Sequence, residues 1–145
     1  MSKKREALVK HWRLEINQQD LVCCVANTID EGIDIVAGNY DNMQDLRQLI
    51  GGNEHVRAKT VAKRGHGVVL IFKFNALHCN ILCHEVTHAT HFFMEWMGVT
   101  LSDSSDEVFA YYNDMLFRFV AQWWQQQKLH ISITTASVPE LIYKP

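Results

Sequence analysis

The spacing of hydrophobic residues predicts strands in the first half of this chain and long helices in the second half. Over residues 8–16, apolar and polar positions tend to alternate, which is typical of a strand with one buried face, although Lys10 breaks the alternation and leaves a short helix as the rival. Residues 56–63 and 67–74 form two further predicted strands, joined by a turn at residues 64–67. The second strand of this pair is apolar almost throughout, as a strand covered on both faces would be.

Three other segments of the first half are less regular. Residues 21–26 and 33–37 are short apolar runs that fit either a strand or a helix. Residues 41–50 fit a helix, because Asp41 can cap its start and two glycines follow its end. The apolar positions of this predicted helix form a stripe: Met43, Leu46, Leu49 and Ile50.

Two long helices are predicted in the second half. Asn75 can cap a helix over residues 76–97, and Gly98 can end it. A second helix is expected over residues 106–127, and residues 131–136 fit a last short strand. This order predicts an α+β fold, in which a small N-terminal β-sheet with helices is followed by two long packed helices.

The composition is typical of a single globular domain. The chain has 145 residues, of which 48% are hydrophobic and 21% charged, and this fits a single domain over residues 1–145. A net charge of −2 gives no general reason to expect a nucleic-acid or membrane partner. No apolar segment follows the basic start of the chain, and the four cysteines lack a disulfide spacing. We therefore expect a cytoplasmic protein with reduced thiols.

The strongest sign of chemistry is the sequence His84-Glu85-Val86-Thr87-His88 within the first long helix. Residues four apart lie one turn apart on the same helix face, so His84 and His88 can bind one zinc ion. Glu85 points toward the same side, where it can take a proton from a zinc-activated water and pass it to the leaving amine. The motif predicts a zinc-dependent peptidase with Glu85 as its base; the alternative is two surface histidines beside a solvated glutamate.

A catalytic zinc site needs a third protein ligand and leaves a fourth position open. The candidates are His91, Glu95, Asp103, Asp106 and Glu107. The first two lie on the motif helix itself, about 10.5 Å or more along its axis from His84, so they cannot easily complete a tetrahedron with the histidine pair. We therefore expect the third ligand to come from the second helix, and Glu107 is our choice.

Glu107 belongs to a narrow polar stripe on a helix that is otherwise rich in apolar residues. The stripe comprises Glu107, Tyr111, Asp114 and Arg118, spaced by 4, 3 and 4 residues. A polar stripe on a buried helix needs a polar partner, which the zinc site would supply, with Asp114 or Tyr111 holding the far nitrogen of a zinc-bound histidine. In the alternative interpretation the stripe faces solvent, and Asp114 and Arg118 form a surface pair.

The HExxH sequence, followed after eighteen residues by Glu107, resembles the pattern of the gluzincin family of zinc peptidases. Residues 106–111 are also similar to a segment of short zinc peptidases encoded in bacteriophage genomes, and a weaker similarity exists to small repressor-cleaving metallopeptidases of mobile elements. The resemblance covers residues 68–120. It implies a minimal zincin-like fold, a Zn2+ cofactor held by His84, His88 and Glu107, a peptide or protein substrate, and the cytoplasm of a bacterial host.

Thermolysin-like members of this family stabilise the oxyanion of the reaction with a histidine from a separate domain, which we do not expect in these 145 residues. Tyr111, Tyr112, His91 and His66 are the candidates for this catalytic role, and we favour Tyr111 because it shares a helix face with Glu107.

Two other groups of residues invite a functional interpretation. Cys79 and Cys83 lie one turn apart and could contribute to a structural zinc site, although buried free thiols are the simpler interpretation. Arg57, Lys59 and Lys63 share one face of a predicted strand, which suits nucleic-acid phosphates or, more simply, solvent.

The main alternative to an enzyme is a non-catalytic metal-binding accessory or host-interaction protein with a zincin-like fold. Three protein ligands and a water would favour the enzyme, whereas four protein ligands would favour a structural site. The strand over residues 68–74 would pair with an extended substrate if it lay at the edge of its sheet, but its apolar character equally fits a central position.

Overall fold

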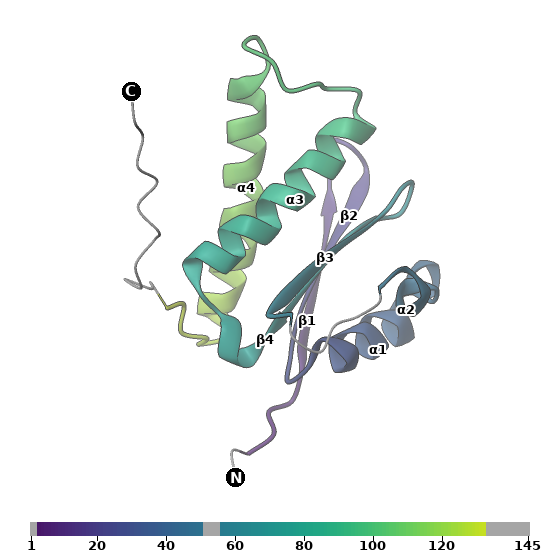
Figure 1. The fold of residues 1–145 in the computed structure, drawn as a ribbon, viewed down its shortest axis with the longest axis vertical. Helices are drawn as coiled ribbons and strands as arrows, with labels where there is room; N and C mark the ends of the chain where they lie inside the picture. Colours follow the sequence, from purple (N-terminus) through teal and green to yellow (C-terminus); the bar gives the residue numbers. More distant parts are fainter. Residues whose placement is uncertain (1–2, 51–55, 133–145) are drawn as a thin grey trace.

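The computed structural model describes residues 3–50 and 56–132 (Figure 1). The strands are β1 Leu8–Leu14, β2 Gln19–Ala26, β3 Ala58–Lys63 and β4 Gly67–Lys73. The α-helices are α1 Ile29–Asn39, α2 Leu46–Leu49, α3 Cys79–Trp96 and α4 Asp106–Gln126, and 3-10 turns occupy Asp41–Met43 and Phe74–Ala76. The fold is α+β, with a four-stranded sheet from the first half of the chain followed by helices, as the order of elements predicted.

The four strands form one sheet in the order β1-β2-β4-β3. β2 and β4 run parallel in the middle of the sheet, whereas β1 and β3 pair antiparallel with them at the two edges. The strand over residues 68–74, considered as a binding edge, is therefore central. Its continuous apolar sequence reflects burial between two neighbouring strands and two helical layers. The edge nearest the motif helix is β3 instead.

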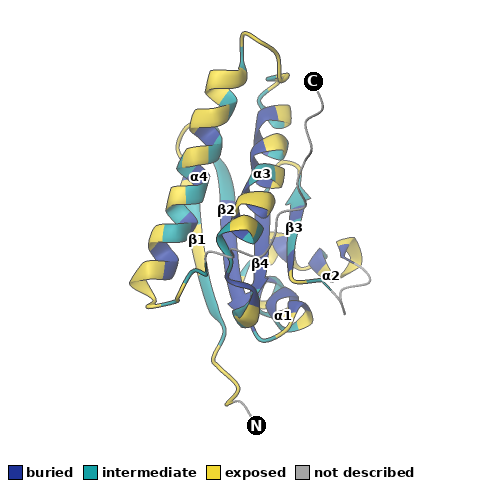
Figure 2. Ribbon diagram, turned by 60° about the vertical axis from the view of Figure 1, so that its left-hand side comes forward, coloured by how far each residue is buried: buried dark blue, intermediate teal, exposed yellow. Residues whose placement is uncertain are grey.

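Helices cover both faces of the sheet, and the central strands are buried between them (Figure 2). On one face, α1 and α2 enclose an apolar cluster that includes Ile33 and Ile71. On the other face, α3 and α4 enclose a larger cluster that includes Phe72, Phe93 and Trp124. The Trp124 ring meets Phe72 edge-on, with centroids 4.8 Å apart. None of the helices in residues 3–50 and 56–132 combines the length and apolar character that crossing a membrane requires.

The two apolar runs whose structure the sequence left open become different elements. Residues 21–26 lie in β2, and residues 33–37 lie in α1. Thr28 lies between the two as the N-cap of α1, and its side chain accepts a hydrogen bond from the Glu31 N–H at 3.0 Å. This cap starts α1, which then packs against β2 and β4.

Two predicted helices are shorter than expected. The helix predicted over residues 41–50 is a 3-10 turn followed by the one-turn helix α2, and no side chain caps either element. The motif helix begins at Cys79 rather than at residue 76, because Asn75 lies inside a 3-10 turn and His78 occupies the N-cap position. The non-helical backbone at Leu77 and His78 separates this 3-10 turn from α3.

The predicted last strand is seen only at its start. Ser132 forms an isolated parallel bridge with His78, just before α3. The remainder of this predicted strand, residues 133–136, lies outside the described residues.

Candidate metal centre on helix α3

Helix α3 places the two histidines of the HExxH sequence side by side on its outer surface. His84 and His88 are both exposed, and their Nε2 atoms lie 3.1 Å apart. Their rings meet edge to face, with centroids 4.7 Å apart and planes at 82°. Helical pitch produces this pair, because residues four apart are stacked along one face.

The spacing of these two nitrogens fits a single metal ion. Zinc binds histidine nitrogen at about 2.0–2.1 Å, so two nitrogens on a tetrahedral zinc lie about 3.3 Å apart. The observed separation between His84 Nε2 and His88 Nε2 is 3.1 Å. Among the described residues, neither ring has a second hydrogen-bond partner, so no side chain there orients either imidazole through its Nδ1 atom.

Glu85 is buried between α3 and the edge of the sheet. It is 7% exposed, and the Thr60 hydroxyl donates a hydrogen bond to its carboxylate. The same hydroxyl lies 3.2 Å from the Glu85 backbone carbonyl oxygen. Thr60 stands in the middle of β3, on the face that α3 covers, so this contact joins the motif helix to the edge strand. A buried carboxylate needs such a donor, because burial deprives it of water.

Two adjoining hollows open between α3 and β3, with volumes of about 360 Å³ and about 440 Å³. The residues that line both are Val56, Ala58, His84 and Glu85. The smaller hollow is completed by Arg57, Asn80 and Ile81, and the larger by Lys59, Thr60, His88 and Phe92. We call the two together the α3–β3 groove. It gives a ligand access to both imidazoles and to the Glu85 carboxylate.

The polar stripe of α4 faces solvent rather than the histidine pair. Glu107 is exposed in the first turn of α4, and Tyr111 is 72% exposed. Asp114 forms an ion pair with Arg118 one turn further on. This arrangement corresponds to the alternative in which the stripe faces solvent, and the structure does not bring these side chains together around the histidine pair.

Helix packing explains where Glu107 lies. α3 and α4 run antiparallel and are joined by residues 97–105 (Figure 1). The Thr90 hydroxyl of α3 donates a hydrogen bond to Asn113 Oδ1 of α4 at 2.9 Å, so these two residues lie at the same height along the helix pair. Glu107 precedes Asn113 by six residues, about 9 Å along α4 toward the connecting loop. His84 precedes Thr90 by six residues, about 9 Å along α3 in the opposite direction. The structure therefore does not bring Glu107 to the histidines.

The other candidates for a third ligand do not join the pair either. Within the part of the chain that the structure describes, no three His, Cys, Asp or Glu side chains are grouped so as to hold a metal ion. This includes His91, Glu95, Asp103 and Asp106. The His91 ring instead packs against Phe109, with centroids 4.6 Å apart. Two imidazoles, rather than three ligands, come together.

None of the four residues considered for the oxyanion lines the α3–β3 groove. Tyr111, the favoured one, projects from the exposed stripe of α4. Tyr112 is buried, its hydroxyl lies 2.8 Å from Asn17 Nδ2, and burial raises the pKa of Tyr112 above its ordinary value. His91 packs on α4, and His66 belongs to the turn between β3 and β4.

The thiols of α3 stay apart from the histidine pair. Cys79 and Cys83 are both free cysteines, as expected, but Cys79 is half-buried and Cys83 is exposed, which corrects the expectation that both are buried. Cys83 directly precedes His84, so its side chain projects about 100° around the helix from that histidine.

Sequence analysis did not identify Thr60, which supplies the hydrogen bond to Glu85. The two residues are separated by 25 positions, and local spacing carries no information about such a contact. One signal was available. Ala58 and Ala62 flank Thr60 on the same strand face, and small side chains there allow a covering helix to approach closely.

Comparison with known proteins assigns no family. The sequence matches no family model, and neither the curated proteins nor the solved structures give a significant match. The functional argument therefore depends on the side chains of α3 and β3.

Proposed function

We propose that this protein is a zinc-dependent peptidase with a minimal zincin-like fold and that the α3–β3 groove is its active site. The observation that carries the proposal is the joint placement of three side chains in one groove. The Nε2 atoms of His84 and His88 are 3.1 Å apart, and Glu85 is 7% exposed beside them. A solvated glutamate, as in the alternative of two surface histidines, would not be buried against an edge strand.

Each residue of the groove would have a distinct task. His84 and His88 would supply two of the ligands of the ion through their Nε2 atoms. Zinc bound there would polarise a carbonyl and lower the pKa of a water molecule. Glu85 would accept the proton of the attacking water and deliver it to the leaving amine. Thr60 would act as a positioning residue, because its hydroxyl fixes the Glu85 carboxylate in place.

An extended peptide is the proposed substrate, because one wall of the groove is an edge strand. The Arg57 carbonyl accepts a hydrogen bond from the Lys73 N–H at 3.2 Å, so these two residues form a hydrogen-bonded pair of the ladder. Such pairs alternate along antiparallel strands, and the backbone groups of Ala58, Thr60 and Ala62 therefore point away from β4. Another strand can bind groups that point outward in this way.

Zinc binding tests the site without a known substrate. We expect His84→Ala and His88→Ala each to weaken zinc binding by more than about tenfold in calorimetric titrations, because each removes one of two converging ligands. Glu107→Gln is the matched control. It alters an exposed acidic residue of α4, and zinc affinity should not change. Loss of affinity in the control but not in the histidine variants would reject the site.

Hydrolysis is tested with Glu85→Gln. The amide keeps the size of the side chain and can still accept the Thr60 hydrogen bond, so the variant should retain zinc. Loss of the base should lower the rate by about 10²–10⁴-fold. Cleavage of a peptide mixture by the zinc-loaded protein, followed by mass spectrometry, measures this rate. If the variant cleaves as fast as the wild type, Glu85 is not the base.

A metal-binding protein that does not hydrolyse its partner is the second candidate function. It is favoured by the grouping of only two imidazoles, with no third ligand beside them in residues 3–50 and 56–132. In that case zinc affinity would depend on His84 and His88 as above, but no peptide would be cleaved. The pair of experiments therefore separates the two functions.

A further inference from the structure

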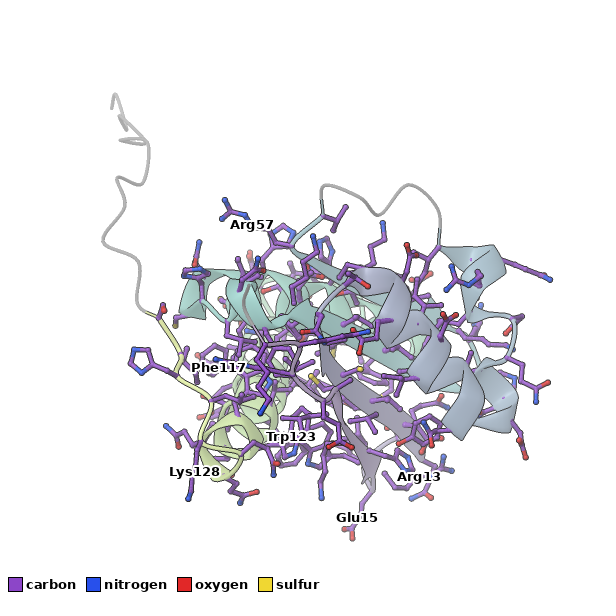
Figure 3. The ribbon with its side chains drawn as sticks, turned by 90° about the horizontal axis from the view of Figure 1, so that it is seen from below. Arg13, Glu15, Arg57, Phe117, Trp123 and Lys128 are labelled. Carbon is purple, nitrogen blue, oxygen red and sulfur yellow. The ribbon has the colours of Figure 1, made fainter. Side chains whose placement is uncertain are left out.

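Two cationic side chains border the α3–β3 groove. Arg57 lines the smaller hollow together with His84 and Glu85, and Lys59 lines the larger one together with His88. Figure 3 shows Arg57 projecting outward from the margin of the molecule. Over the described ranges, neither cation has an ion-pair partner. Their charges therefore stand at the open edge of the sheet, where a strand that pairs with β3 would meet them.

A third cation on the same strand face, Lys63, has an acidic partner. Register places Lys59 opposite Ile71, whose side chain belongs to the cluster beneath α1, so alternate residues of β3 leave the strand on that face. Lys63 is one of these residues, and its Nζ atom lies 2.7 Å from Asp45 Oδ1. Lys63 thus has an acidic partner on this face, whereas Arg57 and Lys59 have none among the described residues.

We infer that β3 binds an extended peptide with two acidic side chains separated by one residue, and that Arg57 and Lys59 recognise the two acids. The inference rests on the proposed function, in which a peptide pairs with this edge. Residues directly opposite each other on neighbouring strands share a face of the sheet. Peptide side chains opposite Arg57 and Lys59 therefore lie on the cationic face. The intervening side chain, opposite Ala58, lies on the α3 face beside Glu85.

A peptide suits this surface better than a nucleic acid does. The backbone of β3 offers outward-pointing donors and acceptors, which pair with a peptide backbone but not with a phosphate chain. Val56, Ile81 and Phe92 add apolar side chains to the walls of the groove, against which peptide side chains can pack. A nucleic acid would present one phosphate per nucleotide, and two cations on a chain of net charge −2 neutralise little of that charge.

Peptide binding to the zinc-loaded, full-length Glu85→Gln protein tests the inference without turnover. The probes are two short fluorescein-labelled peptides, one alternating glutamate with alanine and the other carrying glutamine in place of each glutamate. Fluorescence anisotropy should show tighter binding of the glutamate peptide, weakened by added salt. Arg57→Gln and Lys59→Gln should each reduce this affinity by about two- to fivefold, the size of a cross-strand charge pair. Lys10→Gln, which removes an exposed cation on the opposite edge strand, should not reduce it.

Equal affinity for the two peptides, or affinity for the glutamate peptide that neither Arg57→Gln nor Lys59→Gln lowers, overturns the inference. A labelled single-stranded oligonucleotide is the competing probe. Tighter binding of that oligonucleotide, with the same dependence on Arg57 and Lys59, would assign the cations to nucleic acid and also overturn it. Failure of the proposed function looks different. A wild-type protein that binds the glutamate peptide but cleaves no peptide contradicts the peptidase and leaves acidic recognition in place.

Discussion

At the scale of single residues, the contact between Thr60 and Glu85 fixes the proposed catalytic base. The carboxylate is buried, and the hydroxyl that donates to it comes from a strand rather than from its own helix. A buried carboxylate without a donor destabilises the fold, because it has lost its hydrogen bonds to water and no protein group replaces them. The orientation of Glu85 therefore depends on the position of β3 as much as on the position of α3.

Thr60→Val removes this donor and keeps the shape of the side chain. Because the Glu85 carboxylate then remains buried without its hydrogen bond, we expect the free energy of unfolding to fall by about 1–3 kcal/mol, measured by urea denaturation. Thr60→Ser retains the hydroxyl and should lose less. A Thr60→Val protein as stable as the wild type would show that the carboxylate does not rely on Thr60.

At the scale of elements, segments with a long regular pattern were predictable from the sequence. The predicted strands over residues 56–63 and 67–74 correspond to β3 and β4, and the helix predicted over residues 106–127 corresponds to α4. Short segments were not predictable in the same way. Residues 33–37 fit a strand as well as a helix, and the Thr28 cap and contacts with the sheet make them part of α1.

The start of β4 depends on a glycine. Gly67 pairs with Asp20 of β2 and has a φ of +148°, and a Cβ atom there would lie 2.1 Å from the Asp20 carbonyl oxygen. Gly67→Ala would strain the backbone and displace β2, so we expect the free energy of unfolding to fall by about 2–4 kcal/mol. Thermal unfolding followed by circular dichroism measures the change.

Gly38→Ala is the control for this substitution. A Cβ at Gly38 meets nothing within 4 Å, and the residue lies in α1, where alanine is favoured over glycine by up to about 1 kcal/mol. Stability should therefore stay the same or rise. An equal loss in both variants would mean that the close approach of Gly67 to Asp20 does not matter.

At the scale of the whole molecule, part of the candidate site was predictable and part was not. The convergence of His84 and His88 follows from helical pitch alone. The location of Glu107 depends on how α4 packs against α3, which contacts such as Thr90 with Asn113 establish. A spacing of eighteen residues along the chain contains no information about that packing. The sequence pattern could therefore suggest Glu107 as a ligand, but it could not show which face of α4 is buried against α3.

Zinc should stabilise the folded protein as a whole, because the converging pair exists only in the folded helix. At a free zinc concentration of about 100 times the dissociation constant, the gain in the free energy of unfolding should be about 2.7 kcal/mol. Thermal unfolding with and without zinc measures it, and EDTA should reverse it. The double variant His84→Ala/His88→Ala should lose the gain, whereas Glu107→Gln should keep it. Equal stabilisation of the double variant would place the ion elsewhere.

The edge position of β3 also affects whether two copies of this protein associate through their sheets. Natural sheets usually place charged side chains at an edge to prevent unwanted pairing. β3 carries Lys59 and Lys63 on one face, and Arg57 directly precedes the strand. Two copies that meet edge to edge would bring like charges together. The same cations that would select an acidic strand thus disfavour edge-to-edge pairing of two copies of this chain, which would keep the edge open to a bound peptide.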